Sequence, residues 1–104
     1  MEAKILSFTS QLSNPADIAV LVDGTTLWNT KNLTRSSKAA TCDLSTGSNR
    51  PPKEGRPLSM RVGVQGGGTK DFYFDQEIFY SPTGITQKFA IQGTVKTWRL
   101  MSVK

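Results

Sequence analysis

Histidine is absent from the 104 residues, and cysteine occurs once, at Cys42. The lack of histidine removes the commonest general base and the commonest metal ligand. A single cysteine forms no internal disulfide and builds no zinc site with several thiolates. These two absences argue against an enzyme, and we expect no catalytic residues, no metal and no other cofactor.

Two patterns that accompany catalysis elsewhere are present only in part. Asp75 and Glu77 lie two positions apart, as a pair of catalytic or metal-binding carboxylates could, but a solvated sheet face explains them more simply. The glycine-rich stretch 63–70, GVQGGGTK, lacks the lysine-serine/threonine ending of a phosphate-binding loop. We interpret it as a loop between strands.

Long apolar runs are also missing. No stretch approaches the roughly 18 apolar residues of a membrane-spanning helix, and the N-terminus has no basic segment followed by an apolar one. We therefore expect no membrane association and no signal peptide, and a protein made in the cytoplasm.

Positive charge is abundant by comparison. The net charge is +5, the isoelectric point is near 9.7, and 37% of the residues are hydrophobic. This composition is typical of a globular protein, and the length fits a single domain over 1–104. The basic balance makes a polyanion, above all a nucleic acid, the first partner to consider.

Apolar and polar residues alternate along most of the chain, which predicts a mostly-β fold, an antiparallel sheet with one buried and one solvated face. We expect 3–12 and 16–24 to form an N-terminal hairpin across Ser13-Asn14-Pro15. Further strands are expected at 25–37 (irregular), 38–46, 56–64 and 71–80. Cys42 shares the parity of Ala40 and Leu44, so a buried thiol is predicted.

The segment after Tyr80 permits two interpretations. Ser81-Pro82 could begin a helix over about 82–101, and Ser81-Pro82-Thr83-Gly84 also has the residues of a type I turn. Gly93 and the many β-branched residues disfavour a helix. A C-terminal hairpin is the favoured prediction, with an α+β fold carrying one C-terminal helix as the alternative.

The strands at 38–46 and 56–64 suggest a binding surface if they pair through the loop 47–55. Their shared polar face would then present Thr41, Ser45, Ser59 and Arg61, flanked by Lys38 and Arg56. Cations of this kind contact phosphates, while hydroxyls and an aromatic ring such as that of Tyr73 contact bases. An ordinary solvated sheet face is the alternative.

The succession KAATCDLST, RPLSMRVGV and FYFDQEIFYSP resembles the coat proteins of small single-stranded RNA bacteriophages, the leviviruses. The resemblance covers about residues 3–90 and is one of pattern more than of identity. It implies a homodimer whose sheets join into one antiparallel surface, dimers that assemble into an icosahedral shell, and packaging of the RNA genome in a virion made in the host bacterial cytoplasm. It also implies binding of an RNA hairpin that represses replicase translation. The RNA-facing positions that it implies are Thr41, Asp43, Ser45, Ser59, Arg61 and Tyr73.

The sequence departs from that family at three places. Asp43 stands where the family often has a small hydroxyl, and the loop at 65–70 is shorter. The family ends in two helices, whereas the C-terminal segment here has room for only one and its residues favour a hairpin. Two other functions remain open: a phage single-stranded-DNA-binding protein with a small β-barrel, and a tail or decoration protein of a larger phage. For the coat protein we expect an obligate dimer, because one apolar sheet face and two sheet edges would otherwise be uncovered.

Overall fold

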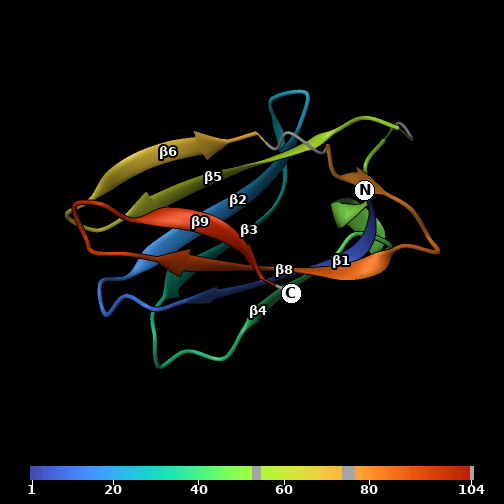
Figure 1. Cartoon of the computed structure of the whole chain (residues 1–104). Helices are drawn as coiled ribbons and strands as arrows, with labels where there is room; N and C mark the ends of the chain where they lie inside the picture. Colours follow the sequence, from blue (N-terminus) through green and yellow to red (C-terminus); the bar gives the residue numbers. More distant parts are fainter. Residues whose placement is uncertain (53–54, 74–76, 104) are drawn as a thin grey trace.

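Alternating apolar residues build two β-sheets that pack face to face, as a computed structural model of residues 1–52, 55–73 and 77–103 shows (Figure 1). These residues form nine strands and one short 3-10 helix, η1 (Gly47–Asn49). The mostly-β prediction is confirmed.

The first sheet, sheet A, has five strands. β1 (Glu2–Ser10) lies at its centre, between β4 on one side and β8 on the other, and β9 forms the far edge. β7 and β8 run parallel to β1, whereas the β1–β4 and β8–β9 pairs are antiparallel. The bounds of the remaining strands of sheet A are β4 (Ala40–Asp43), β7 (Phe79–Tyr80), β8 (Ile85–Gln92) and β9 (Arg99–Val103).

The second sheet, sheet B, has four strands in the order β3-β2-β5-β6, and all neighbours are antiparallel. Its hairpins β2–β3 and β5–β6 turn at Asp23-Gly24 and at Gln65–Gly67. The bounds of its strands are β2 (Ala16–Val22), β3 (Thr25–Leu33), β5 (Leu58–Val64) and β6 (Gly68–Phe72).

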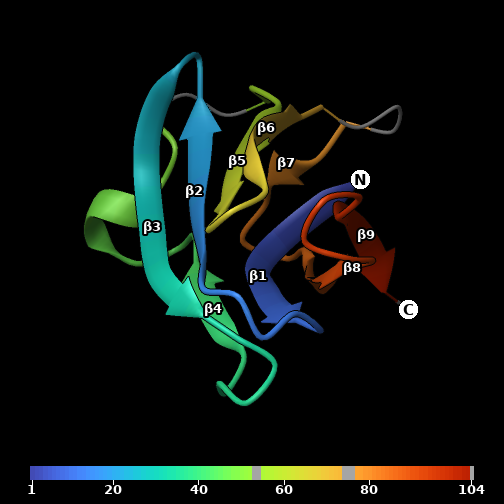
Figure 2. The same cartoon turned by 90° about the vertical axis from the view of Figure 1, so that its left-hand side faces the viewer.

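A stack of aromatic rings joins the two sheets. The ring of Phe8 on β1 lies 5.7 Å from that of Trp28 on β3 and 5.6 Å from that of Phe89 on β8, both nearly parallel to it. Phe8 and Phe89 are fully buried. Figure 2 looks along the space between the two sheets. The buried apolar side chains of both sheets fill this space.

The C-terminal hairpin is confirmed, and the alternative helix over 82–101 is wrong. β8 and β9 pair from Lys88 to Gln92, and the amide of Gly84 donates to the carbonyl of Ser81 at 3.0 Å, as the expected turn requires. Gly84 also passes so close to the backbone of Ala3 that a Cβ atom would overlap it.

The N-terminal hairpin prediction is wrong, because β1 and β2 belong to different sheets. Leu6 and Phe8 on β1 and Ile18 and Val20 on β2 all need burial, and stacking the strands face to face lets each set cover the other. Between them the chain crosses from sheet A to sheet B, with the amide of Gln11 bonded to the carbonyl of Ile91 at 2.9 Å.

The predicted pairing of 38–46 with 56–64 is wrong for the same reason. β4 pairs with β1 in sheet A, whereas β5 pairs with β2 and β6 in sheet B. The expected strand at 71–80 is also divided, since β6 ends at Phe72 in sheet B and β7 begins at Phe79 in sheet A. Phe74 and Asp75, which were part of that prediction, lie outside the described residues.

The two sheets cover each other's apolar faces within one chain, so the premise of a bare apolar sheet face does not hold. The case for a dimer then depends on the sheet edges alone. No helix in residues 1–52, 55–73 and 77–103 is long and apolar enough to span a membrane.

Gly67 offers a test of the contact between the β5–β6 turn and the segment that joins β8 to β9. A Cβ atom there would overlap the carbonyl oxygen of Val95 and lie 2.7 Å from the indole nitrogen of Trp98, which donates to the Gly67 carbonyl at 2.9 Å. We expect Gly67→Ala to lower the free energy of unfolding by about 1–3 kcal/mol through this overpacking. Urea titration measures the effect.

Gly63→Ala is the matched control, because the nearest neighbour of its added Cβ is the side-chain hydroxyl of Thr69, at 3.1 Å. It should change the urea midpoint less than Gly67→Ala does. Equal midpoints for the wild type and Gly67→Ala would contradict the described packing of Trp98.

Candidate nucleic-acid interface

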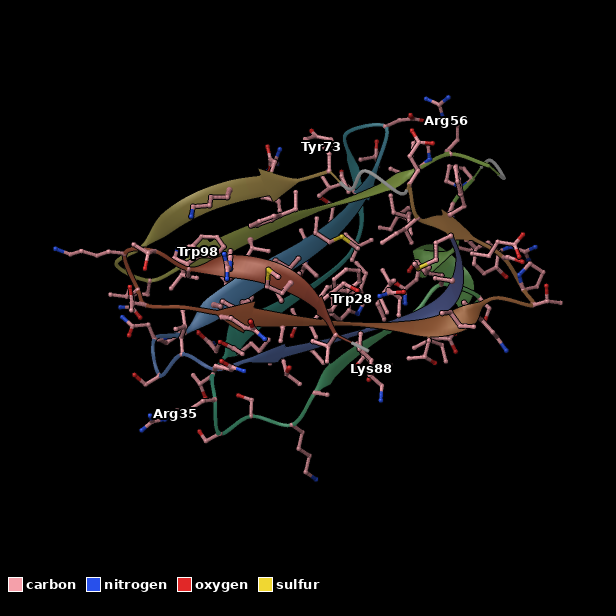
Figure 3. The ribbon with its side chains drawn as sticks, viewed as in Figure 1. Trp28, Arg35, Arg56, Tyr73, Lys88 and Trp98 are labelled. Atoms are coloured by element: carbon pink, nitrogen blue, oxygen red, sulfur yellow. The ribbon has the colours of Figure 1, made fainter. Side chains whose placement is uncertain are left out.

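The eight residues predicted to face RNA separate into two groups on opposite sheets. Lys38, Thr41, Asp43 and Ser45 belong to or flank β4 in sheet A, whereas Arg56, Ser59, Arg61 and Tyr73 belong to or flank β5 and β6 in sheet B. Figure 3 shows Tyr73 and Arg56 at the top of the molecule, and Lys88 of sheet A on the opposite side. The single surface expected from the sequence does not form.

Two residues of the group on sheet A, Asp43 and Ser45, are engaged in local structure. The hydroxyl of Ser45 donates to Oδ1 of Asp43 at 2.6 Å, and the amide of Ser45 donates to the same atom at 3.0 Å. These hydrogen bonds hold the pKa of the Asp43 carboxyl below its usual range. The carboxylate that would repel phosphate thus orders the turn after β4, while the exposed Thr41 lies opposite Ser7 on β1.

Arg61 lies in the middle of β5, on the solvent face of sheet B. It is opposite Ala19 on β2 and Asp71 on β6. Its Nε donates to Oδ1 of Asp71 at 2.7 Å, and the two side chains are 54% and 42% exposed. This hydrogen bond and the carboxylate charge raise the pKa of Arg61.

A second ion pair stands at the end of the same face. Nη2 of Arg56, just before β5, lies 2.5 Å from Oδ1 of Asp23, in the turn between β2 and β3. The Nε of Arg56 donates to both carboxylate oxygens, at 3.1 and 3.2 Å. The pair links the start of β5 to the β2–β3 turn.

A hollow of about 210 Å³ lies between these two ion pairs. Tyr73 follows β6 directly and is 78% exposed, which makes it the most exposed large hydrophobic side chain in the described part of the chain. The hollow is lined by residues of β2, the β2–β3 turn, β5 and β6. Those with the most bearing on its chemistry are Leu21, Asp23, Ser59, Arg61, Asp71 and Tyr73. The structure therefore brings together three of the predicted residues directly and Arg56 through Asp23.

This combination suits a flat, polar-edged ligand. An aromatic ring offers a stacking surface, the Ser59 hydroxyl both donates and accepts, and the carboxylates accept hydrogen bonds from amino groups. Arginine contacts phosphate in bidentate fashion. One nucleotide of a single strand presents all the matching groups.

Sequence reasoning missed Asp23 and Asp71, the carboxylates of this site. A hairpin that turns at Gln65–Gly67 places Arg61 opposite Asp71, so a tight turn in place of a loop over 63–70 would have found the pair. Nothing comparable in the sequence predicts the contact of Asp23 with Arg56, which are 33 positions apart.

The described residues contain no group of three or more cysteine or acidic side chains that could hold a metal ion. Comparison of the chain with protein-family models, with curated proteins and with solved structures finds no match.

Cys42 is fully buried on the inner face of β4, as its parity predicts. Burial, with a contribution from the charge of Asp43, raises the pKa of its thiol to about 12. Since the thiolate is the reactive form, we expect thiol reagents at pH 8 to label the native protein slowly and the urea-unfolded protein rapidly.

A matched control moves the thiol by one position. Thr41→Cys in a Cys42→Ser background places it on the exposed face of β4, where labelling should be at least about tenfold faster. Rapid labelling of native Cys42 would mean that the strand has the opposite register.

Proposed function

We propose that the protein is a virion coat protein that associates with itself to form a shell and binds single-stranded RNA through the hollow of sheet B. The observation that carries the RNA-binding part is the convergence of Ser59, Arg61 and Tyr73 on one hollow. The positive net charge of +5 supports a polyanionic partner.

Each group around the hollow has a role in this proposal. A splayed base stacks on the Tyr73 ring, and the carboxylate of Asp71 accepts a hydrogen bond from a base amino group. Arg61 contacts the phosphate. Because exposed ion pairs contribute little to stability, its partial release from Asp71 opposes RNA binding only weakly.

The proposal takes from the levivirus resemblance the role of a coat protein and an RNA partner, and not the architecture of the dimer. β2 pairs with β5, and β1 lies in the other sheet, so the family's N-terminal hairpin is not available to this chain. Repression of replicase translation through an RNA hairpin belongs to the same proposal and depends on the same site.

Tyr73 gives the sharpest test of the stacking role. Stacking of a base on an aromatic ring is worth about 1–3 kcal/mol by alanine substitution, so Tyr73→Ala should weaken the binding of single-stranded RNA by about 5- to 150-fold. Tyr73→Phe keeps the ring and should bind nearly as the wild type does. Equal affinities for all three proteins in a fluorescence anisotropy titration would exclude stacking at this position.

Arg61→Ala tests the phosphate contact. The logarithm of the RNA-binding constant should fall with the logarithm of the salt concentration, and losing one phosphate contact should reduce that slope by about one. Lys96→Ala, in the exposed loop between β8 and β9, is the control for the loss of a charge. A slope unchanged in Arg61→Ala would show that Arg61 meets no phosphate.

Expression of the chain alone in bacteria tests the coat function as a whole. Negative-stain microscopy should show closed particles, and the nucleic acid extracted from them should be host RNA. Soluble protein that coats single-stranded DNA in a fixed ratio would favour the single-stranded-DNA-binding function instead. Empty particles would leave the shell but remove the RNA partner.

A further inference from the structure

The edges of the two sheets differ in how well they are protected against pairing with another chain. β3 is irregular in register, carries Lys31 and Asn32 (φ 60°), and lies beside η1 (Figure 2). Lysines, bulges and covering segments are the usual ways to block an edge. β4 has only four residues, and on β6 the Lys70 side chain folds back to the carbonyl of Trp98 at 2.8 Å.

β9 has neither a lysine nor a bulge among its five residues, and its one charged side chain, Arg99, lies at its first position. Its register with β8 is regular, and Met101 and Val103 on its outward face are each 37% exposed. Leu100, between Arg99 and Met101, is buried, so by alternation Arg99, Met101 and Val103 share the solvent face of sheet A. A regular edge with exposed apolar side chains is a template for another strand.

We propose that β9 pairs with β9 of a second copy of this chain, antiparallel across a two-fold axis at Met101. This register pairs all five residues of both strands. It brings Met101 against the partner's Met101 and places Arg99 opposite Val103 of the partner subunit, so no cation faces a cation directly. A two-fold contact must be self-complementary in this way.

The same register predicts an electrostatic signature. Val103 is opposite Lys88 on β8, and Lys88 points away from the sandwich (Figure 3). In the dimer, Lys88, Val103 and the partner's Arg99 form one row, with the two cations about two strand spacings, or roughly 10 Å, apart. The repulsion is weak and is screened by salt, so the dimer should tighten as the salt concentration rises, whereas an RNA complex should weaken.

The interface is small. Stable specific interfaces bury about 1,200–2,000 Å², more than a five-residue edge provides, so the dimer should depend on protein concentration. The β9 pairing supplies one contact for the self-association of a coat protein, so its biological role rests on the proposed function. It can be measured without RNA, so its failure would leave the RNA-binding hollow untouched.

Sedimentation velocity of the full chain without nucleic acid tests the pairing. The wild type should change from monomer to dimer with concentration, and Met101→Lys, which puts two cations together at the axis, should weaken the dimer at least about tenfold. Ile85→Lys is the control, because Ile85 is 59% exposed on β8, away from this edge. A wild type that stays monomeric at all concentrations, or a dimer unaffected by Met101→Lys, would overturn the proposal.

Charge reversal tests the register. Arg99→Glu should tighten the dimer, because the new carboxylate lies in one row with Lys88 of the other copy. Lys96→Glu changes the net charge equally but lies in the loop before β9, so its effect should be smaller. Equal effects of the two variants would contradict a two-fold axis at Met101, and both proteins should retain the circular dichroism spectrum of the wild type.

Discussion

The burial of Phe8 between the rings of Trp28 and Phe89 is the contact on which the arrangement of the two sheets depends. It joins β1 and β8 of sheet A to β3 of sheet B, and the aliphatic side chains around it complete one core. Because each sheet covers the apolar face of the other, only the outer faces and the edges of the sheets remain available to a partner. The candidate RNA site and the proposed β9 pairing accordingly lie on different parts of that surface.

Period-two patterning predicted the character of the strands but not their partners. Ile18, Val20 and Val22 on β2 and Leu58, Met60 and Val62 on β5 are buried as their alternation requires. Alternation says which residues face inward and not which strand lies alongside, so one folded sheet and two stacked sheets fit the same pattern. The parallel pairing of β1 with β8, about 80 positions apart, has no local signal at all.

Three of the eight predicted RNA-facing residues line the hollow of sheet B, for a reason that the sequence contains. Ser59 and Arg61 share the solvent face of β5. The β5–β6 hairpin places β6 beside β5, and Tyr73 directly follows β6. Thr41 and Ser45 were assigned to the same face through a strand pairing that does not occur. Asp23 and Arg56 meet only because β2 and β5 are neighbours, which is a property of the tertiary fold.

The central claim, that single-stranded RNA binds at the hollow of sheet B, is tested most directly by following the amide resonances of the protein during titration with a short single-stranded RNA. The account predicts that the perturbed amides cluster around Ser59, Arg61, Asp71 and Tyr73, while those of β4 and the outer face of sheet A stay in place. Perturbations centred on Thr41 and Lys88, with the hollow unaffected, would contradict it.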